Sequence, residues 1–450
     1  MMRKVLLPML IALGIASTSV CAKEALDTPE NLSDEDKLYG LSLFWKEASY
    51  NFAYFDQVPE LDFDNAYREF IPKVLATENT YEYYRELMKF SALLHDGHTN
   101  IYLPKGLSDR YVDWPAIKVT EANHQAVITE IDKRLLAEIP LGSTIISVEG
   151  VDLDTHLKTN IMPYLSSSTE QALWSHSVRD MLKGSPGSQV HFIIQSSSGE
   201  QKAITLKRNS RHIKTETVAL NLPASNGQLF EFRWLDNQVA YVALNSFSDR
   251  QILHDFKLAY KDIKQSEGLI IDIRFNGGGN SGIGAEILSY FANQYLSGSA
   301  WKTRKHIAAY KAWGYKEYAQ DNAWESGSMS MLKAKSDSHI VPTVVLIGRH
   351  TASAAEDFLI YADKLQHFTT IGERTYGSTG QPIFVDLPGG GSFRVCTKRD
   401  TYPDGRDFVG FGISPNILIE RMPEHLKSEQ DVVLNEAIQV ITDARHLVLR

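Results

Sequence analysis

Cysteine is scarce in this chain, because only Cys21 and Cys396 occur among its 450 residues. That scarcity, together with a hydrophobic fraction of 43%, excludes a disulfide-stapled miniprotein and a disordered chain, since such a composition can bury large cores. The 14 histidines are scattered without a metal-ligand spacing. We therefore expect no metal, no cofactor, and two to four domains at roughly 100 to 200 residues each.

Positive charge is also limited, and no block of lysines or arginines occurs. The chain has 46 basic and 55 acidic residues, so its formal net charge is −9. This balance argues against a nucleic acid or an anionic membrane surface as the main partner. Apart from residues 5–16, which are too few to span a bilayer comfortably, long apolar runs are missing. We expect no nucleic-acid partner and no transmembrane span.

The first 22 residues have the layout of a secretory signal peptide. Arg3 and Lys4 form a charged head, the apolar run 5–16 follows, and small residues at 20–22 suggest cleavage after residue 22. Lipidation of Cys21 is the alternative. Cleavage would remove two positive charges and no acids, so the net charge of −9 would become −11. We expect an exported protein, periplasmic or extracellular, whose single remaining cysteine has no internal disulfide partner.

The mature chain divides into a helical N-terminal region, a β module, an α/β core and a C-terminal helix, at 23–112, 113–212, 213–425 and 426–450 respectively. In the helical region, Ser33 followed by Asp36 is a capping-box-like helix start, and helical spacing recurs over 64–75 and 80–94. The core alternates strands with helices, its first buried strands being expected at 238–244, 268–274 and 340–347. Such a layout forms sites where strand ends meet helix N-termini.

The β module consists of short strands separated by glycine turns. Its strands are expected at 126–131, 142–150, 187–194 and 203–206, with a helix near 171–182 between them. The order of these segments and their glycines resembles a PDZ module, which binds an extended peptide end as an added strand. A small β domain that merely packs is the alternative.

A glycine-rich turn, Gly277-Gly278-Gly279, follows the second buried strand of the core. Glycines there let backbone N–H groups point at a negative charge, because no side chain blocks the approach. The turn lacks the spacing of a dinucleotide or P-loop motif. It favours an oxyanion hole over a nucleotide site.

Ser353 lies between Ala352 and Ala354 at an expected strand-to-helix junction. A serine placed there is exposed as a nucleophile would be, with the N–H of the next residue available to an oxyanion. On its own such a serine is as often a helix N-cap, so the interpretation needs a base. His98, in the loop Leu94-His-Asp-Gly-His-Thr99, supplies a candidate, whereas His95 is given no role.

Five segments in this order resemble peptidase family S41, the tail-specific or C-terminal-processing serine peptidases, and most closely its tricorn-core-like branch. They lie at 96–99, 272–279, 351–356, 372–377 and 410–415. The resemblance implies an α/β (α+β) multidomain fold with a helical N-terminal region, a PDZ-like module and a ClpP/crotonase-like α/β catalytic core. It also implies a peptide or unfolded protein as substrate.

Carried over by motif, the resemblance implies Ser353 as nucleophile, His98 as general base, and the backbone N–H groups of Gly278 and Ala354 as oxyanion donors. One branch of the family uses a Ser/Lys dyad, with the lysine in a Gly-Lys-Gly run after the serine. Here that run reads Gly-Ser-Thr-Gly-Gln at 377–381, and no lysine occurs between 364 and 398. The dyad is therefore excluded, which leaves the histidine-based branch.

That branch also places a glutamate to orient the histidine, and this chain has Val409 at the matching position. Asp407 is the nearest acid and is our candidate orienting residue, with Asp404 and Glu373 as further candidates. An acid that holds the histidine tautomer increases the rate but is not obligatory for residual activity.

Residues 295–338 form a polar, aromatic-rich insertion in the core. Its aromatic residues are Trp301, Tyr310, Trp313, Tyr315, Tyr318 and Trp324. It either covers the cleft and stacks on substrate, or forms a packed subdomain or dimer contact.

The sequence thus predicts an exported serine endopeptidase that acts through an acyl-enzyme on Ser353, of undetermined oligomeric state. The alternative is a catalytically degenerate scaffold of the same fold that binds peptides without cleaving them.

Overall fold

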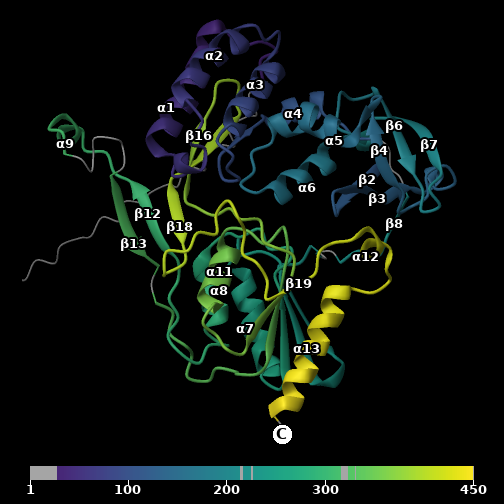
Figure 1. Ribbon diagram of the computed structural model, residues 1–450, viewed down its shortest axis with the longest axis vertical. Helices are drawn as coiled ribbons and strands as arrows, with labels where there is room; N and C mark the ends of the chain where they lie inside the picture. The colour runs from purple at the N-terminus through teal and green to yellow at the C-terminus, as the bar shows by residue number, and fades with distance from the viewer. Residues whose placement is uncertain are drawn as a thin grey trace, which may run out of the picture.

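The computed structural model describes residues 28–212, 216–223, 225, 227–315, 323–329 and 331–448. The predicted signal peptide lies outside these residues. Figure 1 shows an α+β multidomain arrangement, as predicted, with a helical region and a β module at one end and an α/β core at the other. Within the described part of the chain, none of the helices has the length and apolar character needed to cross a membrane.

Three helices build the N-terminal region, and each begins at a capping side chain. They are α1 (Asp34–Asn51), α2 (Phe63–Leu75) and α3 (Thr80–Ala92). Ser33 accepts a hydrogen bond from the N–H of Asp36, which confirms the predicted start of α1. The apolar faces of the helices meet around Phe90, whose ring contacts those of Phe44 and Phe63. A short helix, α4 (Lys105–Tyr111), follows.

The β module is a twisted sheet with the strand order β2-β3-β4-β6-β7, to which β5 and β8 are added. Its elements are β2 (Ile117–Ala122), β3 (Gln125–Asp132), β4 (Thr144–Val148), β5 (Val151–Asp152), α5 (Leu153–His156), α6 (Glu170–Asp180), β6 (Gln189–Gln195), β7 (Gln201–Lys207) and β8 (Thr217–Ala219). The predicted pairing of the last two long strands is confirmed as the antiparallel β6–β7 hairpin. The module has its own hydrophobic core, in which Trp174 of α6 packs with Ile128 and Phe192.

The core is a six-stranded sheet with the order β19-β15-β14-β11-β10-β9, and only β9 is antiparallel to its neighbour. Its strands are β9 (Phe230–Leu235), β10 (Val239–Leu244), β11 (Gly268–Asp272), β14 (Thr343–Ile347), β15 (Phe368–Gly372) and β19 (Ile417–Leu418). Helices α7 (Gln251–Ile263), α8 (Ser281–Leu288) and α11 (Ala354–Ala362) cover one face. The terminal helix α13 (Val432–Val448), preceded by α12 (Pro423–Lys427), covers the other, where Ile441 packs on Ile270 (Figure 1).

The C-terminal part of the core returns to the helical region. Strand β17 (Ser392–Cys396) pairs with β16 (Pro382–Asp386) on one side and with β1 (Asn100–Tyr102) on the other, both antiparallel. Phe393 of β17 packs edge-on against Phe44 of α1, so that the helical region and the core share one hydrophobic core. The β1–β17 pairing therefore brings the His98 loop, which directly precedes β1, next to the C-terminal part of the core.

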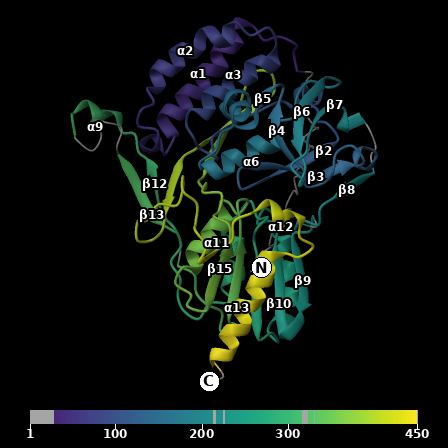
Figure 2. The same ribbon diagram turned by 45° about the vertical axis from the view of Figure 1, so that its right-hand side comes forward.

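The aromatic-rich insertion forms an arm on the side of the molecule away from the β module (Figures 1 and 2). Strands β12 (Ala300–Arg304) and β13 (Trp324–Ser328) pair antiparallel, and β12 also pairs with β18 (Lys398–Thr401). The short helix α9 (Ala308–Ala312) belongs to the connection from β12 to β13 in the chain, and Trp313, which follows it, is 65% exposed. Tyr318 lies outside the described residues.

Candidate active site

Ser353 lies on a sharp turn between β14 and α11. Its backbone has φ 56° and ψ −124°, a conformation that non-glycine residues rarely adopt and that costs about 1 to 3 kcal/mol. The turn is held in place from the neighbouring strand loop, because the Thr351 hydroxyl donates to the Ile273 carbonyl at 2.8 Å and the Ala352 N–H donates to the Asn276 carbonyl at 3.0 Å. These two hydrogen bonds therefore hold Ser353 in its strained backbone conformation.

The glycine-rich turn lies directly against this serine. Gly278 has φ +100°, and a Cβ added to it would lie 2.6 Å from Ser353 Cβ and 2.9 Å from Ala354 N. Asn276 holds the turn, since its Oδ1 accepts the N–H of Gly278 at 2.9 Å. The N–H of Ala354 has no hydrogen-bond partner in the part of the chain that the structure describes. Of the two predicted oxyanion donors, Ala354 is therefore free, and Gly278 is already bonded.

Glu356 is a buried organiser of the serine turn. Its Oε1 accepts from the Thr375 hydroxyl at 2.6 Å and from Gly377 N–H at 2.8 Å, and its Oε2 accepts from Ser353 N–H at 3.1 Å and Ser378 N–H at 3.2 Å. Burial raises the pKa of this carboxyl, and the four donors oppose the rise. One carboxylate therefore fixes both the serine turn and the 375–378 loop.

His98 is buried, with 8% of its surface exposed, and it contacts that same loop. Its Nδ1 lies 2.6 Å from Ser378 Oγ, while the Ser378 carbonyl accepts the N–H of Ser353 at 3.1 Å. Ser378 is thus bonded to both residues. No direct hydrogen bond joins the His98 ring and the Ser353 hydroxyl in this structure, as is common in unliganded sites.

A buried acid lies behind Ser378. Asp96 Oδ1 is 3.5 Å from Ser378 Oγ and accepts from the Ser168 hydroxyl at 3.2 Å, and its Oδ2 accepts from the Thr99 hydroxyl at 2.7 Å. Burial raises the pKa of Asp96, and these hydrogen bonds oppose the rise. The order from the ring outward is therefore imidazole, hydroxyl, carboxylate.

The electrostatic environment keeps the imidazole neutral. Burial, together with the positive charges of Arg394 and Lys398, lowers the pKa of His98 to about 3. In a neutral ring that donates from Nδ1 to Ser378 Oγ, Nε2 is the nitrogen able to accept a proton.

Asp407, predicted to orient His98, is bonded elsewhere. Its carboxylate accepts two bonds from the Arg399 guanidinium at 3.0 Å, near the outer strand β18. The other candidate acids also pair with arginines, Asp404 with Arg406 and Glu373 with Arg421. The structure therefore corrects this assignment, because Ser378 occupies the position at Nδ1.

Sequence reasoning missed Ser378, Asp96 and Glu356 as members of the site. Each lies within a segment that the motifs contained, but nothing in a linear pattern shows that the 96–99 and 377–381 segments touch. A signal existed for Ser378, since it occurs in the run where the dyad branch has its lysine. Among the described residues, no group of three or more His, Cys, Asp or Glu side chains could hold a metal ion.

The β module contacts the loops of the site through the segment before α6. Ser168 accepts the N–H of Gly97 at 2.8 Å, and Thr169 donates to the Tyr376 carbonyl at 3.1 Å. Glu121 of β2 also pairs with Arg349, which lies in the loop leading to Ser353. The module is therefore bonded to both the histidine loop and the serine loop.

Comparison with known proteins gives consistent matches. Residues 238–419 match the model of peptidase family S41. The carboxy-terminal processing protease CtpB of Bacillus subtilis is 25% identical over 58% of this chain and 48% of its own length. The chloroplastic C-terminal processing peptidase of Tetradesmus obliquus is 24% identical over 61% of this chain and 55% of its own. The chain thus spans about half the length of the curated relatives it matches.

The fold is similar to that of a solved structure over nearly the whole chain. The crystal structure of mature CPAF has a TM-score of 0.71 at 13% identity, covering 91% of this chain and 98% of that one. The matched region 238–419 contains the glycine turn, the strained serine and Glu356, and its sheet is the one that positions all three. The core of the chain, residues 238–419, is thus similar to peptidase family S41, and its relatives of 24 to 25% identity are processing proteases of that kind.

Proposed function

We propose that the protein is an exported serine endopeptidase that hydrolyses peptide bonds through an acyl-enzyme on Ser353. The observation that carries the proposal is the double role of Ser378, which is bonded to the backbone of Ser353 and to the ring of His98. This contact unites a strained serine, an imidazole and a free backbone N–H, which are the parts that acyl transfer needs.

In the proposed reaction, Ser353 Oγ attacks the scissile carbonyl carbon while His98 Nε2 takes the hydroxyl proton. The C=O electron pair moves to oxygen, and the Ala354 N–H binds the resulting oxyanion. Gly278 can act as a second donor only when its N–H turns from Asn276 toward the substrate. His98 then gives its proton to the leaving nitrogen as the C–N bond breaks. Water repeats the sequence on the ester and frees Ser353.

Ser378 and Asp96 act as positioning residues in this scheme. The ring donates from Nδ1 to Ser378 Oγ, and the Ser378 hydroxyl is aimed at Asp96 Oδ1, 3.5 Å away. This fixes the tautomer that leaves Nε2 unprotonated and stabilises the imidazolium once it forms. In this scheme the Ser378 hydroxyl links Asp96 to His98, and no direct contact between His98 and Asp407 is needed.

The β module is proposed to bind the substrate as a PDZ-like domain, since β2 is an edge strand beside α6. The names of the processing-protease relatives favour a peptide or protein substrate, and we propose peptides and unfolded proteins as the substrate class. The signal-like first 22 residues support export to the periplasm or beyond.

A fluorophosphonate probe tests the proposal. We expect it to label the wild-type protein and not the Ser353→Ala variant, with labelling strongly reduced in His98→Ala. Both variants should fail to cleave casein while keeping the wild-type circular dichroism spectrum. An absence of labelling between about pH 6 and 9 would instead identify a degenerate peptide-binding scaffold, and retained cleavage by both variants would refute the catalytic assignment.

A further inference from the structure

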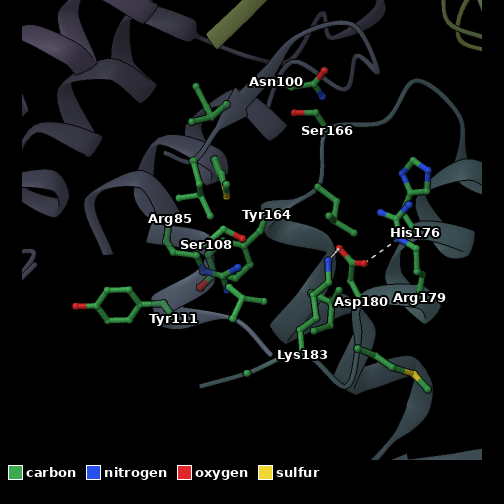
Figure 3. Close-up of a pocket in the computed structure, with 18 of the residues that line it drawn as sticks. Arg85, Asn100, Ser108, Tyr111, Tyr164, Ser166, His176, Arg179, Asp180 and Lys183 are labelled. Atoms are coloured by element: carbon green, nitrogen blue, oxygen red, sulfur yellow. Dashed lines mark hydrogen bonds and ion pairs between the residues drawn. The ribbon is translucent and has the colours of Figure 1, made fainter. Parts of the chain in front are cut away.

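A cavity of about 680 Å³ lies between the helical region and the β module, within the size range of ligand sites. It is bounded by α3 and α4 on one side and by α6 with the segment before it on the other (Figure 3). It also reaches Gly97, which precedes His98, and Tyr376, two residues before Ser378. The cavity therefore lies next to the loops that carry His98 and Ser378.

The walls of this cavity carry a strong excess of positive charge. Five cationic side chains line it, Arg85, Arg179, Lys183, Arg208 and Arg394, against the single carboxylate of Asp180. The two lining histidines add no charge near neutral pH, because burial lowers the pKa of His156 and lowers that of His176 to about 4. This excess contrasts with the net charge of −9 of the whole chain.

Asp180 neutralises only part of that charge. It accepts from Arg179 at 2.9 Å and from Lys183 at 2.7 Å, and Figure 3 shows its carboxylate between the two. Within the part of the chain that the structure describes, no carboxylate lies within ion-pair distance of Arg85, Arg208 or Arg394.

The unpaired guanidinium groups are held in place by neutral contacts. Arg85 stacks on the ring of Tyr164, 3.2 Å from its centroid. Arg394 donates to Gly97 O at 2.8 Å and to Asn100 Oδ1 at 2.7 Å. A guanidinium has five N–H donors, so these arginines are pre-positioned and retain donors for a further acceptor.

We propose that this cavity is a subsite for a carboxylate of the peptide substrate, which deepens the proposed function and rests on it. Guanidinium groups bind carboxylates through paired, charge-assisted hydrogen bonds, and the partial enclosure reduces screening by salt. Because the cavity adjoins the His98 loop, a chain that reaches Ser353 extends naturally into it. Aromatic side chains along the wall, Tyr111, Trp114 and Tyr164, would pack on its backbone.

Fluorescence anisotropy with the Ser353→Ala protein tests binding without turnover. Three short fluorescein-labelled Ala/Gly peptides serve as probes: one with glutamates and an amidated end, one with glutamines and an amidated end, and one with glutamines and a free end. We expect the glutamate peptide, the free-ended peptide or both to bind about tenfold more tightly than the neutral one, with a preference that falls as salt rises. Whichever of these two peptides binds more tightly shows whether the cavity binds a side-chain carboxylate or the carboxylate at the chain end.

Arg85→Gln, made in the same background, should remove most of this preference, and Arg85→Lys should keep part of it. Arg68→Gln, an exposed arginine on α2 outside the cavity, is the matched control and should change nothing. Equal binding of all three peptides, or an equal loss for all three in Arg85→Gln, would overturn the proposal. If the wild-type protein reacts with fluorophosphonate but no carboxylate preference is found, the subsite proposal is refuted and the proposed peptidase activity is not. If the preference is found but the protein is not labelled, the proposed peptidase activity is refuted and the subsite proposal is not.

Discussion

Replacing Glu356 with glutamine isolates the contribution of the carboxylate under the serine turn. The amide would keep one acceptor oxygen and place an NH₂ where the other oxygen was. The better orientation puts the NH₂ beside Thr375, because the Thr375 hydroxyl can turn to accept it whereas a backbone N–H cannot. The N–H of Gly377 and the turned O–H of Thr375 then lose their acceptor.

Each buried donor left unsatisfied costs about 1 to 3 kcal/mol, and we expect the free energy of unfolding of Glu356→Gln to fall by at least that amount. Urea unfolding followed by circular dichroism measures it. The rate constant kcat should fall as well, since the 375–378 loop that carries Ser378 is loosened. Glu356→Ala would leave three donors without an acceptor, the Thr375 hydroxyl and the N–H groups of Gly377 and Ser378, because Ser353 N–H keeps the Ser378 carbonyl. Their combined cost is comparable to the whole stability of a domain, so we expect that variant not to fold.

Glu82→Gln is the matched control, because Glu82 also lies in the first turn of a helix, α3, but is exposed. Its effect on unfolding should remain within about 0.5 kcal/mol. A Glu356→Gln protein with wild-type stability and wild-type kcat would refute the argument that this carboxylate holds the site together.

Three further predictions concern the same site. Gly278→Ala should reduce kcat/KM at least a hundredfold, since its Cβ would meet Ser353 and Ala354 N. Gly277→Ala is the matched control and should reduce kcat/KM far less, because its Cβ would lie in open space. Similar losses of kcat/KM in both variants would contradict this. Because the pKa of His98 is lowered and the base acts in its neutral form, kcat/KM measured against pH should show no loss between pH 7 and 5; a midpoint near 6.5 would refute it. Ser378→Ala should lower kcat about tenfold or more in steady-state assays, with little change in KM, because it removes the partner of His98 Nδ1. Asp407→Asn should leave both constants within twofold, because Asp407 is paired with Arg399. The reverse result would show that Asp407, and not Ser378, orients His98.

Local pattern was sufficient to predict most elements of the fold. Capping at Ser33, the buried strands β10, β11 and β14, and the helix after the serine all follow from spacing within a few residues. The segments bearing Ser353 and His98 could be selected for the same reason, because a small-residue turn and a Gly-adjacent imidazole are visible in the chain itself.

The remainder of the site depends on contacts between distant segments. Asp407 is close in sequence to the expected position, but the pairing of Thr401 with Asp407 places it beside Arg399. Ser378 reaches His98 across 280 positions of sequence. The bond from Gly278 N–H to Asn276 depends on a side-chain rotamer that no residue pattern encodes. These are consequences of packing, which a single sequence does not show.

The pairing of β1 with β17 has a consequence for how the protein matures. Asn100 and Arg394, which are bonded across this pair, are 294 positions apart. During synthesis the N-terminal helices emerge long before their partner strand, and the packing of Phe44 is completed only when Phe393 has been made. The histidine loop and the serine turn can therefore come together only when nearly the whole chain is present, so the proposed protease activity could not arise while the chain is still being made.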